Sequence, residues 1–115
     1  MIKSKNECKV EVRENMRGGD GSIEICHLVT EDDLYNKGRL FATITLKSGC
    51  SIGKHTHEQD SEIFHILTGT ALYDDNGTEK TVGAGDVLIC KKGESHSIKN
   101  TGDSDVVLTA LIVYA

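Results

Sequence analysis

Three side chains that commonly bind metals lie close together between Gly49 and Gly69. His55 and His57 are two residues apart, and Glu62 follows five residues later. Residues two apart on a β-strand point to the same face, with their Cα atoms about 6.5 Å apart, so both imidazoles could converge on one point. His96, at the start of a later expected strand, could supply a third imidazole. Three imidazoles and a carboxylate without a thiolate suit Mn, Fe, Co, Ni or Zn.

Four protein ligands would leave two positions of a six-coordinate ion open to water or to a bidentate ligand, which permits catalysis. The sequence therefore predicts a divalent transition-metal site made by His55, His57, Glu62 and His96. Glu62 could also act as a general base if it loosened from the metal. A lone pair of histidines would be weak support for such a site, but here an acid and a distant histidine accompany the pair.

The other polar and aromatic residues have simpler interpretations. Strand alternation counted from Glu62 sends His65 outward, where a surface or interface role is expected. His27 lies on an apolar strand face and is expected to be a core or pocket residue, or a neighbour of a metal ligand. Asn100 is expected to organise the turn after its strand. Solvated loop charges are expected at Lys54, Glu58 and Asp60. Core packing is expected for Phe41 and Phe64, although either side chain could wall a pocket.

Short β-rich runs separated by Gly, Asn and Asp turns predict an antiparallel sandwich or barrel. No segment has a convincing helical period. Gly49 and Gly53 are expected in a loop, and Asn76-Gly77 between two β-like runs predicts a hairpin. Residues 1–21 are expected to form a polar N-terminal arm with one short strand, and residues 22–115 a single barrel domain. In the arm, a half-buried strand face is expected from the alternating residues Cys8, Val10 and Val12.

The composition restricts the classes of partner. The 115 residues fit one domain, and the net charge of −5 disfavours nucleic acid and anionic membranes. No apolar run approaches the roughly 20 residues of a membrane span. The first twelve residues have no apolar signal core, so the protein is expected in the cytoplasm. The four cysteines form no C-x-x-C pair and are expected to be reduced, partly buried thiols.

The last expected strand, Val106–Tyr114, is apolar on both of its faces. A strand that faces water on one side normally alternates between apolar and polar residues. We therefore expect this strand, with Ile63 and Leu67, to bury a homodimer interface. A second sheet of the same chain would explain the pattern equally well.

The spacing of these residues resembles the two signature motifs of the cupin superfamily. The first motif contains Gly49, His55, His57, Glu62 and Gly69, and the second contains Gly85, Gly93, His96 and Asn100. Fifteen residues separate the motifs, as in small single-domain microbial cupins, and the resemblance covers residues 39–113. It implies a jelly-roll-like double-stranded β-helix with a metal in its interior. Lys91 stands where the second motif usually has proline, which puts the stiffness of that loop in question.

The resemblance does not fix a reaction, because one fold hosts many functions. Family members include dioxygenases, decarboxylases, isomerases, lyases and proteins that only bind small molecules. We expect the metal to hold a small oxygenated metabolite, with dioxygenase-type chemistry on Fe, Mn or Ni as the first enzymatic candidate. The alternative is a non-catalytic protein that binds a metal and a small molecule.

Overall fold

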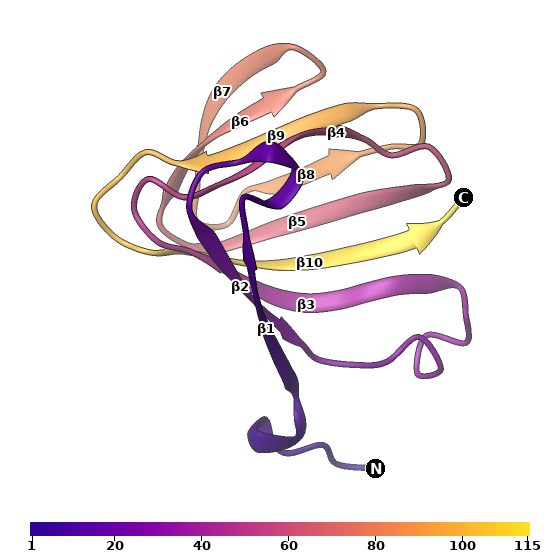
Figure 1. Ribbon diagram of the computed structural model, residues 1–115. Coiled ribbons are helices and arrows are strands. Elements are labelled where there is room, and N and C mark those ends of the chain that lie inside the picture. Colours follow the sequence, from indigo (N-terminus) through magenta and orange to yellow (C-terminus); the bar gives the residue numbers. More distant parts are fainter.

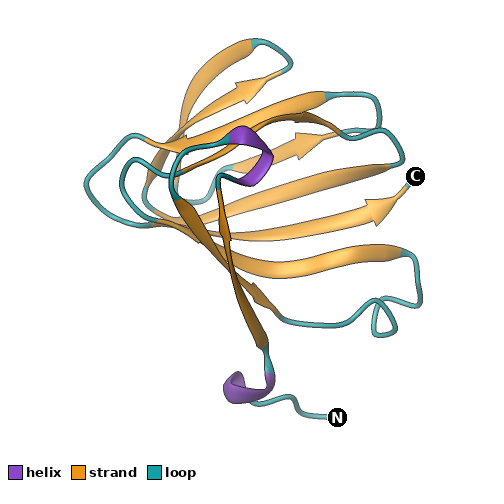
Figure 2. Ribbon diagram, in the orientation of Figure 1, coloured by secondary structure: helices purple, strands orange, loops and turns teal.

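A computed structural model describes all 115 residues, and β-strands make up almost all of its regular structure (Figure 1, Figure 2). The strands are β1 (Lys9–Glu14), β2 (Ser22–His27), β3 (Gly38–Leu46), β4 (Ser51–Thr56), β5 (Asp60–Thr68), β6 (Thr70–Asp75), β7 (Thr78–Gly83), β8 (Val87–Cys90), β9 (Ser95–Asn100) and β10 (Val106–Tyr114). Two short 3-10 helices are η1 (Lys5–Glu7) and η2 (Met16–Gly18). The chain contains no helix with the length and apolar character needed to span a membrane.

Two antiparallel sheets face each other and enclose one core (Figure 1). The larger sheet has the strand order β1-β2-β3-β10-β5-β8, and the smaller has the order β4-β9-β6-β7. The strands alternate as their sequences predict, so that Ala42, Ile44 and Leu46 of β3 are buried while the residues between them are half-buried. This architecture confirms the expected antiparallel all-β, double-stranded β-helix fold.

Tight turns connect consecutive strands within a sheet and between the two sheets. Asn76 and Gly77 join β6 to β7 as a two-residue hairpin, and both have positive φ angles, of 52° and 96°. This combination is the one that a type I′ turn requires, so the hairpin prediction is confirmed. Gly69 joins β5 to β6 with φ of +88°, and a Cβ there would lie 2.6 Å from the main-chain oxygen of Asp105. Only glycine fits this crowded turn.

Two local expectations are wrong. Val10 and Val12 of β1 are 53% and 63% exposed, so they do not form a half-buried face. β1 pairs only with β2, at the edge of the larger sheet, and no other layer covers these valines. Gly53 lies within β4 rather than in a loop, at a shift of register that falls between Ile52 and His55.

Residues 15–21 are held against the start of β4 by main-chain contacts. The N–H of Ser51 donates to the carbonyl of Asp20 at 2.9 Å, and the N–H of Asp20 donates to Oγ of Ser51 at 2.8 Å. A Cβ on Gly53 would clash with the main-chain oxygen of Arg17. The segment therefore packs on β4 next to His55. A boundary between an arm and a barrel at residue 21 stays a prediction.

The strand β10 alternates in burial despite its uniformly apolar sequence. Its inward residues, Val106, Leu108, Ala110 and Ile112, are buried, and the residues between them are half-buried. The second sheet of the same chain accounts for the inward half of the pattern. No element of the chain lies over the outward half, because the larger sheet packs on the smaller one with its other face.

Candidate metal centre

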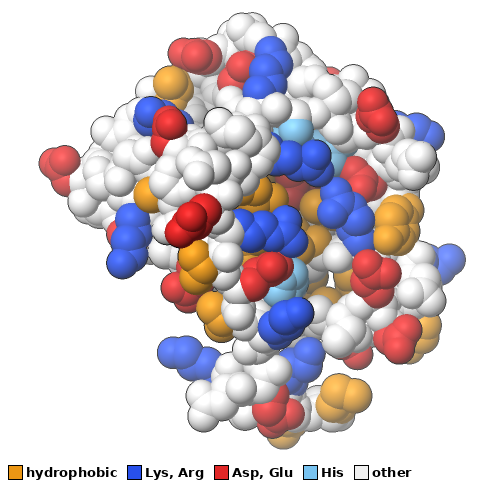
Figure 3. Space-filling model, viewed as in Figure 1, with side chains coloured by type: hydrophobic (Ala, Val, Ile, Leu, Met, Phe, Trp, Pro, Cys, Tyr) orange, Lys and Arg blue, Asp and Glu red, His pale blue; other side chains and the backbone are white.

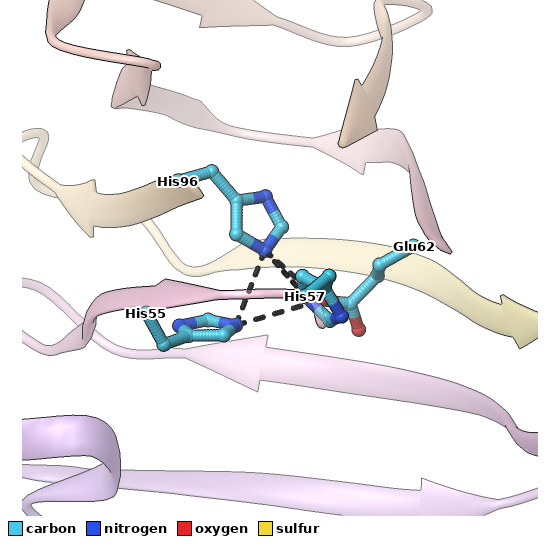
Figure 4. Close-up of side chains that lie close together, drawn as sticks. All are labelled: His55, His57, Glu62 and His96. Carbon is cyan, nitrogen blue, oxygen red and sulfur yellow. Dashed lines mark hydrogen bonds and ion pairs between the residues drawn. The ribbon is translucent and has the colours of Figure 1, made fainter. Parts of the chain in front are cut away.

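Four side chains from three strands and one loop converge inside the barrel (Figure 4). His55 belongs to β4, His57 follows the last residue of β4, Glu62 belongs to β5, and His96 belongs to β9. The pairing of β4 with β9 places His55 directly opposite His96. One ligand atom from each of the four residues lies within 4.8 Å of the others, and the cluster could hold a metal ion.

The four ligand atoms are three imidazole nitrogens and one carboxylate oxygen. Nε2 of His96 lies 3.1 Å from Nε2 of His57 and 3.2 Å from Nε2 of His55. Oε1 of Glu62 lies 3.1 Å from Nε2 of His96 and 3.2 Å from Nε2 of His57. Its distance to Nε2 of His55 is 3.9 Å. Glu62, His57 and His96 are buried, so this is an enclosed polar cluster.

The other nitrogen of each ring has a partner that fixes the ring. Nδ1 of His55 lies 2.8 Å from the carbonyl oxygen of Gly53, and Nδ1 of His57 lies 2.6 Å from Oδ1 of Asp60. Both partners can only accept, so both Nδ1 atoms carry the proton when the rings are neutral. Nδ1 of His96 lies 2.7 Å from the hydroxyl of Tyr73, which can accept in the same way.

This assignment of protons leaves three Nε2 lone pairs and a carboxylate oxygen directed at one another. Such an arrangement has no hydrogen atom to share among its members, and a cation in the middle satisfies all four. Neutral imidazole is also the form that ligates metals. The donor set therefore fits a divalent transition ion better than it fits a hydrogen-bonded network of neutral groups.

The expectation that Asp60 is a solvated loop charge is wrong. It is the first residue of β5, not a loop residue, and only 6% of it is exposed. Its Oδ2 accepts a hydrogen bond from Nε of Arg39 at 2.7 Å, while its Oδ1 accepts from His57. Burial alone would raise the pKa of Asp60, but these two hydrogen bonds outweigh it and lower the pKa. Metal-binding histidines commonly donate their second nitrogen to such a carboxylate.

The charges of the cluster are set by opposing effects. Burial would raise the pKa of Glu62. In the metal-free protein, hydrogen bonds that the three histidines donate once their Nε2 atoms carry a proton outweigh burial and hold this pKa far below its ordinary value. Burial lowers the pKa of His96 and favours its neutral form. The hydrogen bond with Glu62 raises the pKa of His57, against the opposing effect of burial. The cluster therefore contains an ionised carboxylate beside histidines of unlike basicity.

The loop that carries Lys91 also supports His57. The N–H of Lys91 donates to Oε1 of Glu94 at 2.8 Å, a bond that a proline at this position could not make. The N–H of His57 donates to the carbonyl of Glu94, and the N–H of Gly93 donates to the carbonyl of His57. Side-chain bonding by Glu94 thus closes the loop that proline stiffens in the usual motif.

A small cavity of about 60 Å³ lies beside the cluster and is lined in part by His55, His57 and Glu62. Its polar wall includes Arg13 of β1, Arg17 of η2 and Arg39 of β3, which are all the arginines of the chain. The apolar part of its wall comprises Met16, Ile25, Leu40, Ile44, Ile52 and Ile112. Figure 3 shows Lys and Arg side chains gathered around a hollow in this face, with His side chains visible among them.

Local sequence patterns do not single out these arginines. Their spacing forms no motif, and the strand order that brings β1 and β3 to one side of the cluster is not visible in local patterns. One compositional signal was available. The chain has ten lysines and only three arginines, yet all three arginines and none of the lysines line the cavity.

The remaining singled-out residues lie around the cluster or away from it. Phe64 stacks on the His96 ring, with centroids 5.2 Å apart. Asn100 is buried and bonds Leu46, Gly102 and Ser104, which confirms its role in the turn. His65 is exposed, as strand alternation predicts. His27 contacts none of the four ligands and instead lies 2.6 Å from Oε1 of Glu11.

Comparison with known proteins agrees with this geometry. Residues 42–114 match the family model of the cupin domain. The chain belongs to the cupin family. An oxalate-binding protein of Thermotoga maritima is 43% identical to this cupin over 113 residues, which is 98% of this chain and 93% of the relative.

Solved structures of other proteins have the same fold as this chain. The crystal structure of a predicted oxalate decarboxylase from Thermotoga maritima is 43% identical to this cupin, with a TM-score of 0.95 over 100% of both chains. A Klebsiella pneumoniae protein with a double-stranded β-helix domain gives a TM-score of 0.72 at 21% identity. That match covers 97% of this chain and 88% of the other, and it shows the fold alone.

Proposed function

We propose that this cupin holds a divalent transition metal through His55, His57, Glu62 and His96, and binds a small oxygenated acid of the oxalate class on it. The observation that carries the proposal is the convergence of three Nε2 atoms and a carboxylate within 4.8 Å, beside a cavity lined by every arginine of the chain. The Thermotoga maritima oxalate-binding relative supports the ligand class.

Each residue of the site would have a separate role in binding the metal or in orienting its ligands. The metal, when bound, would act as a Lewis acid that attracts and polarises an oxyanion. The histidines would hold it with Nε2, and Asp60 would keep His57 oriented. Glu62 would serve as a ligand, because its carboxylate oxygen lies among the three Nε2 atoms. Mn, Fe, Co, Ni and Zn all suit this donor set.

Metal-loaded and chelator-treated protein, titrated calorimetrically with oxalate, tests the proposal. We expect about one equivalent of divalent metal by elemental analysis, and oxalate binding only to the loaded protein. Metal binding without oxalate binding would reject the ligand class. The absence of any bound metal after incubation with each of the five candidate ions would reject the whole proposal.

Dioxygenase-type turnover stays a prediction on the same site. It is favoured by the mixed wall of the cavity, in which apolar side chains could exclude water while the polar side meets the ligand. Oxygen uptake by the Fe-, Mn- or Ni-loaded protein with enediols or flavonol-like phenols would reveal it. Binding of the acid without turnover for any loaded metal would favour the non-catalytic alternative.

We also propose a homodimer formed by the outward face of the larger sheet. Exposed or half-buried apolar side chains cover this face on neighbouring strands: Ile63 and Leu67 on β5, Val87 and Ile89 on β8, and Val107, Leu111 and Val113 on β10. Contiguous exposed apolar surface of this kind is typical of a protein interface. A cytoplasmic location, and the expected lack of nucleic-acid and membrane partners, stay predictions.

A further inference from the structure

We propose that Arg17 selects a dicarboxylate over a monocarboxylate at the metal centre, so that the N-terminal segment completes the ligand site. This inference rests on the proposed function, because it concerns the second charge of a ligand already held by the metal. It assigns the selecting group to a segment that precedes the part of the chain matched by the cupin family model.

The three arginines of the cavity differ in what already neutralises them. Nε of Arg39 is 2.7 Å from the Asp60 carboxylate, and Nη2 of Arg13 is 3.1 Å from the Glu11 carboxylate. Arg17 has neither an ion pair nor a side-chain hydrogen bond, although it lines the same cavity. A guanidinium carries five donors in a fork that matches the two oxygens of a carboxylate. Arg17 is the arginine with that fork unoccupied.

The backbone holds Arg17 in this place at some conformational cost. Its φ and ψ of 56° and 30° lie in the left-handed region, which non-glycine residues other than Asn and Asp rarely adopt. Its main-chain oxygen packs against Gly53, where a Cβ would clash with it. Nδ2 of Asn15 donates to the carbonyl of Gly19 at 3.1 Å and closes the same turn. The side chain is thus attached to a fixed piece of main chain beside the cluster.

Counting charges around the cavity favours a dianion. A divalent ion bound by neutral histidines and the Glu62 carboxylate would keep one positive charge. The two paired arginines add little, because Asp60 and Glu11 offset them, and Arg17 adds a second positive charge. A small dicarboxylate matches both charges, with one carboxylate on the metal and the other on Arg17, whereas a monocarboxylate leaves Arg17 unpaired.

Calorimetric titration of the Mn-loaded full-length chain with oxalate and with glycolate tests this assignment. Glycolate can also chelate a metal through two oxygens, but it carries a single negative charge. The wild-type protein should bind oxalate more tightly. Arg17→Gln should weaken oxalate binding about tenfold or more, as expected for loss of a charge-assisted hydrogen bond, and glycolate binding by less than about twofold. Arg17→Lys should recover part of the preference for oxalate.

Two further variants separate this role from folding and from overall charge. Arg17→Asn keeps a residue that tolerates the left-handed backbone and should match Arg17→Gln in its binding. Lys47→Gln removes an exposed positive charge that does not line the cavity, and should leave both affinities unchanged.

Each result on the Arg17 variants bears directly on the inference. An equal loss of oxalate and glycolate binding, or no loss of either, in Arg17→Gln and Arg17→Asn would overturn the role of Arg17 while leaving the proposed function intact. Tighter binding of inorganic phosphate than of oxalate by the wild type would overturn the dicarboxylate class. Failure of the wild type to bind metal, or to bind either acid, would instead reject the proposed function.

Discussion

Nδ1 of His57 donates a hydrogen bond to Oδ1 of Asp60 over 2.6 Å, and both groups are buried. The bond fixes the proton of the imidazole on Nδ1 and directs Nε2 towards the other three ligands. Arg39, which bonds the second oxygen of Asp60, in turn fixes the carboxylate. One chain of contacts therefore runs from Arg39 in the wall of the cavity, through Asp60, to His57 of the candidate metal site.

Replacing Asp60 with Asn should weaken metal binding roughly 10- to 100-fold, the range usual for partners of metal-binding histidines. The amide lacks the negative charge that holds the Nδ1 proton of His57, and it leaves Arg39 without its counter-ion. A competition titration against a chromophoric chelator measures the effect. Glu58→Gln, at an exposed neighbouring carboxylate, is the matched control and should bind metal as the wild type does. Equal affinities in the two variants would contradict this role of Asp60.

Replacing His57 with Ala should remove most of the bound metal, because the variant keeps only three of the four ligands and creates a gap in the cluster. His65→Ala removes an exposed histidine of β5 that lies outside the cluster, and should retain the full metal content. Elemental analysis of both variants after dialysis provides the comparison. Full retention of metal by the His57 variant would disprove the ligand assignment.

Replacing Tyr73 with Phe should destabilise the metal-free protein by about 1–3 kcal/mol, the usual cost of leaving a buried polar group without its partner. The hydroxyl of Tyr73 lies 2.7 Å from Nδ1 of His96, and both residues are buried. Urea unfolding measures the free energy of unfolding. Tyr35→Phe alters an exposed tyrosine and serves as the control. A Tyr73 variant as stable as that control would show that the bond contributes nothing.

Metal affinity should fall as the pH is lowered, since ligand imidazoles must be neutral to coordinate. The hydrogen bond with Glu62 raises the pKa of His57 above its ordinary value of 6.5, despite the opposing effect of burial. In the metal-free protein, the raised pKa means that protonation of His57 adds stability below about pH 6.5, which is lost as the pH rises through the raised value. Metal competes with that proton, so the metal affinity should begin to fall above about pH 6.5 on acidification.

Equilibrium metal binding followed from about pH 8 to pH 5 tests this dependence. Circular dichroism at each pH serves as the control, because it separates release of the metal from unfolding of the chain. Undiminished affinity at about pH 5 would argue against a site built on three histidines.

Replacing Leu67 with Glu should shift the protein from dimer to monomer, because it places a charge on the apolar outward face of β5. Leu67 is exposed in the single chain, so the change should cost the fold itself little. Sedimentation velocity at micromolar concentration distinguishes the two states. Thr81→Glu, on the exposed side of β7 in the smaller sheet, is the matched control. A wild-type protein that sediments as a monomer would end the dimer proposal.

Local sequence patterns were sufficient to predict the inward faces of several strands, one hairpin and the residues of the candidate metal site. The alternation of apolar residues specified the inward side of β3 and β5, because the side chains of a strand alternate between its two faces. Asn76-Gly77 specified its hairpin, since both residues tolerate positive φ. The spacing of His55, His57 and Glu62 indicated the candidate metal site. Side chains two apart on an extended chain point to the same face, so the two histidines could meet. His96 was added to this set because it occupies the histidine position of the second cupin-like motif.

Only the tertiary structure decided what surrounds that cluster. Asp60 reads as a loop charge in sequence, yet the start of β5 buries it between His57 and Arg39. Arg13 and Arg17 precede His55 by about forty residues, and they reach the cavity because β1 pairs with β2 and residues 15–21 pack on β4. Periodicity reports which face of a strand is apolar. It does not report which strands become neighbours, and the order of strands in the two sheets determines the polar wall of the site.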